Sequence, residues 1–132
     1  MTDNTIILDW LAEMQSCVRA VDYDRAEHSF ASDVVAFGTF EGVVTGRQSL
    51  RAAQWSQVWP TIRDFTFRLA ELQGGSEGDL AWGVCPWDST GRRPDGSAFA
   101  RPGRMTVILQ RREGRWLAIH THFSLFPAKP PR

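Results

Sequence analysis

The fold is decided by Gly114-Arg115-Trp116-Leu117-Ala118-Ile119-His120-Thr121-His122-Phe123-Ser124. Successive side chains of a β-strand point to opposite faces of its sheet. One face of this segment therefore carries Trp116, Ala118, His120, His122 and Ser124. The other face carries Leu117, Ile119, Thr121, Phe123 and Leu125. Neither set is suited to open water, so we expect helices to cover one face and a second subunit to cover the other.

The turn before this strand sets its register against residues 104–111. A two-residue type I′ turn would need a positive φ at Glu113, which is unfavourable for a residue with a side chain. We therefore predict a three-residue loop with Gly114 in the left-handed region. In that register Val107 pairs with Ile119, and one face of the hairpin is almost wholly apolar. The opposite face then carries Arg104, Thr106, Gln110, Trp116, His120, His122 and Ser124.

The composition fits one folded domain. The chain has 132 residues, 42% of them hydrophobic, with six Trp and eight Phe, which argues against disorder. We predict a single domain over residues 1–127 and a frayed tail over 128–132. Basic and acidic residues balance at 15 each, and seven of the arginines lie within residues 92–115. A solvated or ion-paired sheet face explains that cluster, so no nucleic-acid partner is expected.

The two cysteines and the N-terminus bear on location. Cys17 and Cys85 fall in a predicted helix and a predicted strand without metal-type spacing, so they are expected to be buried thiols in a reducing compartment. Asp3, Asp9 and Glu13 interrupt the N-terminal segment, which excludes a signal peptide or membrane span there. The sequence predicts a cytoplasmic protein without a membrane partner.

The periodicity of the apolar residues changes along the chain. Residues 5–20 repeat at helical spacing, and Asp24 with Glu27 forms a capping-box pattern for a short second helix. Residues 34–37 and 40–44 read as strands. Thr45 with Gln48 predicts the start of a third helix that ends at Pro60. Twofold alternation then predicts strands over 65–69, 80–85, 104–111 and 115–125, with 74–78 and 88–103 as connections. Helices followed by strands indicate an α+β domain.

Several of these motifs together resemble a known superfamily. Gly114-Arg115-Trp116 followed by His120-Thr121-His122-Phe123-Ser124 resembles the end of the nuclear transport factor 2-like superfamily, in its SnoaL-like branch and in the association domain of calcium/calmodulin-dependent protein kinase. Val44-Thr45-Gly46, Ala81-Trp82 and Arg111-Arg112-Glu113-Gly114 extend the likeness. The resemblance implies a cystatin-like α+β roll, a cone-shaped, curved antiparallel sheet wrapped around N-terminal helices and a pocket, usually dimeric. This fold hosts isomerases, cyclases, dehydratases, hydrolases and binding domains.

The resemblance carries over few active residues. The ketosteroid isomerase branch uses a tyrosine on the first helix and an aspartate after the first strand, and alignment places Met14 and Gly38 there. In the kinase association domain arginines line the pocket, whereas the matching positions here are Val84, Val107 and Phe123. An anion pocket of that kind is not expected. The resemblance therefore implies an apolar pocket without that acid and base.

We expect this pocket to bind a small apolar molecule. Large aromatic side chains serve either as core or as the wall of a ligand cavity, and both readings stay open for the tryptophans. Thr121 is the one polar group expected on the inner wall of the last strand. The predicted pocket residues are Phe37, Trp55, Trp59, Trp82, Val84, Val107, Thr121 and Phe123.

His120 and His122 allow three interpretations. A histidine pair at i and i+2 can bind a metal, supply a general base, or form hydrogen bonds near a subunit contact. A metal needs a third ligand, and no Asp, Glu or Cys stands at a recognisable spacing. The structural interpretation is therefore preferred, and neither a metal nor a cofactor is predicted.

Three functions follow from the sequence. The first is a homodimeric binding domain for a small hydrophobic molecule, without an assignable reaction. The second is an isomerase, cyclase or dehydratase that uses His120 or His122. The third is an oligomerisation module. The predicted dimer contact is the sheet face with Arg104, Trp116, His120, His122 and Ser124.

Overall fold

The computed structural model describes residues 4–127, and the predicted tail over 128–132 lies outside them. Helix α1 (Thr5–Ala20) has the predicted bounds and buries its apolar stripe. Helix α2 (Tyr23–Glu27) begins two positions earlier than the capping-box pattern predicted, because the side chain of Asp22 accepts a hydrogen bond from the Arg25 backbone N–H at 3.2 Å. The predicted cap at Asp24 is wrong.

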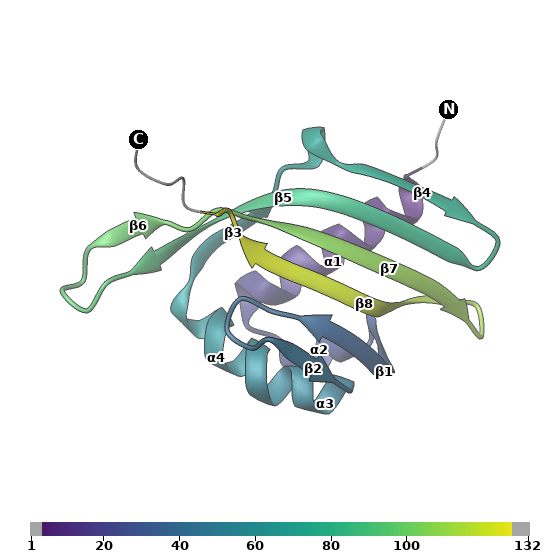
Figure 1. Cartoon of the computed structure of the whole chain (residues 1–132), viewed down its shortest axis with the longest axis horizontal. Coiled ribbons are helices and arrows are strands. Elements are labelled where there is room, and N and C mark those ends of the chain that lie inside the picture. The colour runs from purple at the N-terminus through teal and green to yellow at the C-terminus, as the bar shows by residue number, and fades with distance from the viewer. Residues whose placement is uncertain (1–3, 128–132) are drawn as a thin grey trace.

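The helices form one layer of the fold, and one curved sheet forms the second layer (Figure 1). Its strand order is β2-β1-β8-β7-β5-β3, and β4 and β6 each pair with β5. The pairs are antiparallel apart from β1 with β8, which run parallel and were not predicted. The strands are β1 (Phe30–Phe37), β2 (Val43–Thr45), β3 (Arg63–Phe67), β4 (Gln73–Glu77), β5 (Leu80–Arg92), β6 (Ala98–Ala100), β7 (Gly103–Arg112) and β8 (Arg115–Leu125).

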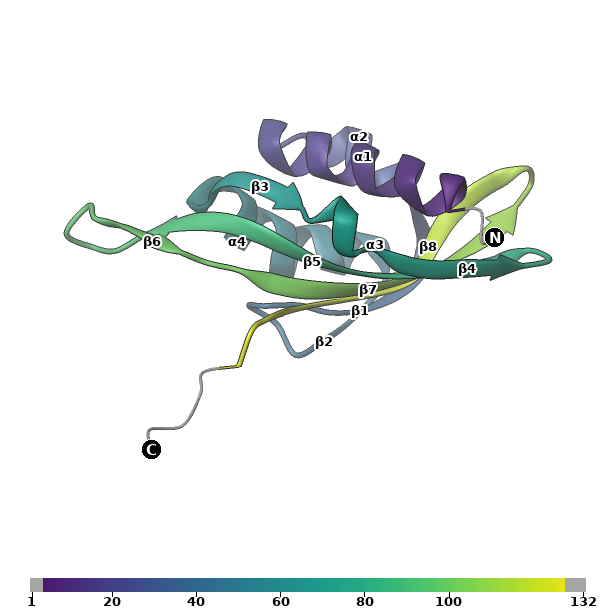
Figure 2. The same ribbon diagram turned by 90° about the horizontal axis from the view of Figure 1, so that it is seen from above.

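The helices lie on one side of this sheet. Figure 2 shows α1 and α2 along one face, while no helix of the part that the structure describes covers the other. Because the apolar residues of α1 and of the inner sheet face meet between the layers, the core forms there. The predicted α+β class with a curved sheet is confirmed, except that the sheet is mixed rather than wholly antiparallel.

The third helical segment is irregular. It consists of α3 (Arg47–Leu50), the π-helix η1 (Arg51–Trp55), α4 (Ser56–Val58) and the 3₁₀ turn η2 (Trp59–Thr61). The predicted capping box is wrong, because Gly46 with φ 94° occupies the N-cap without a side-chain hydrogen bond. Pro60 lies inside the final turn rather than after it. A π-turn often marks a functional site.

The predicted connections 74–78 and 88–103 are wrong in part. Residues 73–77 form β4, and a 3₁₀ turn η3 (Leu69–Glu71) precedes it. Strand β5 continues to Arg92, and buried and exposed residues alternate along its whole length. Its C-terminal part pairs with β6 as a hairpin. Ser89 anchors the hairpin, since its hydroxyl donates to the Arg101 carbonyl at 2.7 Å and its own carbonyl accepts from the Arg101 N–H at 2.8 Å. These two bonds hold the backbone of Arg101 beside Ser89 of β5.

The turn between β7 and β8 also differs from the prediction. Glu113 has φ 51° and Gly114 has φ 75°, which are the two positive angles of the type I′ turn that we had set aside. This turn together with a one-residue shift further along pairs Val107 with Thr121 rather than with Ile119. The pairing shifts by one residue between Ile108 and Leu109, which leaves Ile119 as a β-bulge.

On the two sides of the bulge, the alternation of inner and outer side chains along β8 is reversed. Beyond it, Thr121 lies on the inner face and His120 and His122 on the outer face, as predicted. Between the turn and the bulge the prediction is wrong. Ala118 is fully buried and Trp116 packs against the core, so Trp116 does not belong to the outer face.

Candidate functional site

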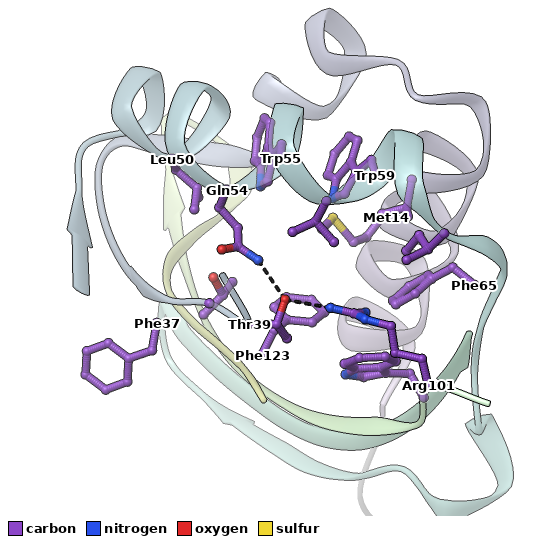
Figure 3. Close-up of a pocket in the computed structure, with 16 residues that line it drawn as sticks. Met14, Phe37, Thr39, Leu50, Gln54, Trp55, Trp59, Phe65, Arg101 and Phe123 are labelled. Carbon is purple, nitrogen blue, oxygen red and sulfur yellow. Dashed lines mark hydrogen bonds between the residues drawn. The ribbon is translucent and has the colours of Figure 1, made fainter. Parts of the chain in front are cut away.

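A cavity opens between the irregular helix, α1 and the inner face of the sheet (Figure 3). The cavity region encloses about 480 Å³ of atom-free space, part of it open to solvent, and only a small part is wide enough to hold water. Its walls are aromatic. Trp55 and Trp59 stack with ring centroids 4.9 Å apart, and Phe65, Trp87 and Phe123 line the opposite side. Such a narrow space suits a flat, mostly apolar molecule.

One end of the cavity is polar. The π-helix places Gln54 there, with only 7% of its side chain exposed. The Gln54 amide oxygen accepts hydrogen bonds from the backbone N–H groups of Phe40 and Glu41, both at 3.0 Å. Its amide nitrogen donates to the Thr39 hydroxyl oxygen at 3.0 Å, and the Arg101 guanidinium donates to the same oxygen at 2.9 Å (Figure 3). A loop, a helix and a hairpin thus meet at one hydroxyl.

Arg101 lies in an unusual electrostatic environment. Its guanidinium sits over the Trp87 ring, 5.7 Å from the centroid, and burial lowers its pKa. No carboxylate within residues 4–127 forms an ion pair with it. By contrast, carboxylates raise the pKa values of Arg25, Arg51 and Arg68. A partly buried cation without a counter-ion is costly, since desolvation is not offset by an opposite charge.

Five of the eight predicted pocket residues line this cavity: Phe37, Trp55, Trp59, Thr121 and Phe123. Thr121 is 2% exposed on the inner wall. The ring of Phe37, however, points away from the cavity (Figure 3). Phe37 instead packs its ring edge-on against two imidazoles of the outer face, with centroids 5.0 and 5.1 Å away.

The other three predicted residues lie elsewhere. Val107 is fully buried in the core, and Trp82 and Val84 lie on the outer face of β5, where Trp82 is 48% exposed. Where α1 approaches it closely, the inner face of β5 carries the small residues Ala81, Gly83 and Cys85. A Cβ at Gly83 would stand 2.7 Å from Ile7, so only glycine fits. The prediction had assumed that the largest apolar residues face inward.

The two histidines do not reach the cavity. His120 and His122 lie on the outer face, and the His120 Nδ1 atom is 2.7 Å from the Val35 carbonyl oxygen. Because a carbonyl only accepts hydrogen bonds, Nδ1 carries the proton. Met14 and Gly38, at the positions of the isomerase tyrosine and aspartate, do line the cavity. Arg101 is the only ionisable side chain among the 16 lining residues.

Thr39, Gln54 and Arg101 were not predicted from the sequence. Gln54 could have been suspected as a site residue, because it is a polar residue beside the tryptophans of an otherwise apolar helix face. Arg101 could not, because the Gly- and Pro-rich stretch around it reads as an exposed loop. Of the other arginines in residues 92–115, Arg111 and Arg112 form ion pairs and the rest bind hydroxyl or carbonyl oxygens.

No group of three or more His, Cys, Asp or Glu is placed to hold a metal ion in residues 4–127. None of the helices described for this chain is both long enough and apolar enough to span a membrane.

Comparison with known proteins identifies the family. The model of the SnoaL-like domain matches residues 7–129, and the chain therefore belongs to the SnoaL-like domain family. No curated protein matches the chain. The structural neighbours place this family within the nuclear transport factor 2-like superfamily, as the sequence motifs indicated.

Three solved structures illustrate the likeness. A ketosteroid isomerase-like protein from Erwinia carotovora atroseptica superimposes with a TM-score of 0.81 at 14% identity, covering 97% of this chain and 100% of its own. An uncharacterized protein with a cystatin-like fold from Caulobacter vibrioides gives 0.77 at 16% identity, covering 92% and 88%. A nuclear transport factor 2-like protein of unknown function from Pseudomonas putida gives 0.72 at 27% identity, covering 89% and 82%. The first two likenesses establish the fold alone.

Proposed function

We propose that the chain binds a small, flat, mostly apolar molecule in the cavity between Trp55, Trp59 and Phe123. The carrying observation is the aromatic wall itself, because stacked indoles lining a narrow space offer large contact area to a flat ring. Among the lining residues there is no Asp, Glu, His, Cys, Lys or Tyr to transfer a proton. The proposal therefore includes binding and no reaction.

Tryptophan fluorescence tests this function. A panel of steroids, polyketides and fatty acids is titrated into the protein, and ligand binding should change the emission of the stacked pair. The variant Val58→Phe adds a ring to the cavity wall and should abolish the response, whereas Val43→Phe on the 69% exposed edge strand should not. Circular dichroism verifies that both variants fold. Equal responses in wild type and Val58→Phe would contradict the proposal.

We further propose that the outer sheet face forms a homodimer. It is supported by partly exposed apolar side chains on the face that no described helix covers, among them Val35 and Phe37, each 37% exposed. His120, His122, Arg104 and Ser124 complete this surface, and Trp116 is removed from it. Sedimentation of wild type and Phe37→Glu tests the proposal. A wild-type monomer at all concentrations would refute it, as would a dimer that Phe37→Glu leaves intact.

A cytoplasmic location is also proposed. Its support is that Cys17 and Cys85 are both buried and unpaired, which suits a reducing compartment. Fractionation of the native host would test it.

A further inference from the structure

We infer that the molecule bound in this cavity carries one anionic group, a carboxylate, which Arg101 and Thr39 hold at the polar end. This inference rests on the proposed binding function and specifies its ligand class. Gln54, Thr39 and Arg101 together offer hydrogen-bond donors to a ligand and no free acceptor.

The orientation of the Gln54 amide is fixed by its neighbours. Two backbone N–H groups, from Phe40 and Glu41, point at one amide atom at 3.0 Å each. That atom has to be the oxygen, because a nitrogen there would set donor against donor. Both lone pairs of the oxygen are then used. The amide nitrogen consequently faces Thr39, and Gln54 has no acceptor left for a ligand.

The same count applies to Thr39. Its hydroxyl oxygen accepts from Gln54 at 3.0 Å and from Arg101 at 2.9 Å, so its two lone pairs are occupied. The hydroxyl hydrogen has no acceptor within residues 4–127. Thr39 is therefore a donor to whatever enters the cavity.

Arg101 adds further donors and the only charge. A guanidinium has five N–H groups, and one bond to a side chain, that to Thr39, is made. The remaining N–H groups and the uncompensated positive charge lie in a cavity whose only other polar lining side chains are those of Thr39, Gln54 and Thr121. The three polar side chains at this end thus present donors and no acceptor. An alcohol or an amine would bring its own donors into this environment, whereas a carboxylate brings only acceptors and the missing negative charge.

The shape of the cavity limits the size of the ligand's apolar part. The polar end lies opposite the stacked Trp55 and Trp59, which enclose a space too narrow for a bulky group. The inferred ligand is a monocarboxylate whose body is a small ring system or short alkyl chain. The arginines of the kinase association domain are replaced here by Val84, Val107 and Phe123, and Arg101 from the β6–β7 connection supplies the positive charge.

Calorimetric titration with a matched series tests the inference. Three skeletons are each used with three end groups: benzoate, benzyl alcohol and benzylamine; the 2-naphthyl analogues; and hexanoate, hexanol and hexylamine. Each carboxylate that fits should bind at least about tenfold more tightly than its alcohol or amine, the range expected for charge-assisted hydrogen bonds.

Variants assign the preference to its residues. Arg101→Met should remove the preference for the carboxylate while the alcohol still binds, Arg101→Lys should keep part of it, and Thr39→Val should reduce it. Arg92→Met, at the exposed end of β5 and outside both the cavity and the proposed dimer surface, is the matched control and should change nothing. Retained alcohol binding shows that a variant has folded with its cavity intact.

The outcomes separate the two proposals. Equal affinity for the three end groups, or a carboxylate preference that survives Arg101→Met, overturns the inference and leaves the binding function standing. If no compound of the series and none of the fluorescence panel binds, the proposed function fails and the inference fails with it.

Discussion

Replacement of Gln54 by leucine tests whether this side chain holds the polar end of the cavity together. Leucine is similar in size but removes three hydrogen bonds, those to Phe40, Glu41 and Thr39. At about 1 kcal/mol net for each bond, less about 1 kcal/mol regained from burying the added apolar surface, the free energy of unfolding should fall by about 2 kcal/mol. For a domain of this size that corresponds to a melting temperature lower by about 6–10 °C.

Urea denaturation with linear extrapolation measures the change, and Gln57→Leu serves as control. Gln57 lies on the same helical segment but is exposed, so its replacement should alter the free energy by less than about 0.5 kcal/mol. Gln54→Glu retains an acceptor for Phe40 and Glu41 and should be less destabilised than Gln54→Leu. Its carboxylate would also stand beside Arg101 and weaken carboxylate binding. A Gln54→Leu variant as stable as wild type would show that the network contributes little.

Three further outcomes are expected. Glu27, whose pKa is lowered by its hydrogen bond to Arg51, stabilises the fold above its ordinary pKa of 4.5 and loses that effect as the pH falls. Glu27→Gln should therefore cost about 1–2 kcal/mol at pH 7 and little at pH 3 in urea titrations, and an equal cost at both would contradict this. Burial raises the pKa of both cysteine thiols to about 11, so a thiol reagent at pH 8 should label none in the native protein and two after unfolding. Trp87→Ala should cost about 3–5 kcal/mol in the same assay and Trp82→Ala less than about 1, because only the former is fully buried; similar values would refute the assignment of faces.

The regular elements were predictable because their periodicity is strong. The apolar spacing of residues 5–20 gave α1 its correct bounds, and the alternation in residues 104–125 gave both final strands. The β-bulge at Ile119 was not predictable, because nothing in an alternating pattern shows where one residue is skipped. Its effect is local but large, since it turns Trp116 from the outer to the inner face.

The candidate site was predictable only in its apolar part. Trp55, Trp59 and Phe123 follow from size and periodicity, whereas Trp82 was misplaced because the close approach of α1 to Gly83 has no signal in a single sequence. The polar end joins three segments that are far apart in the chain. Thr39 and Arg101 are 62 residues apart, and only the paired strands bring them together.

The parallel pairing of β1 with β8 has a consequence for how the chain acquires its structure. The contact between Val35 and His120 spans 85 residues. Strand β1 is therefore synthesised long before β8, the strand that pairs with one of its edges. Closing so long a loop early is entropically unfavourable, and folds rich in such contacts are slow to form. During synthesis the edge of β1 that does not pair with β2 stays open to other chains, and the sheet is completed only after β8 has left the ribosomal tunnel.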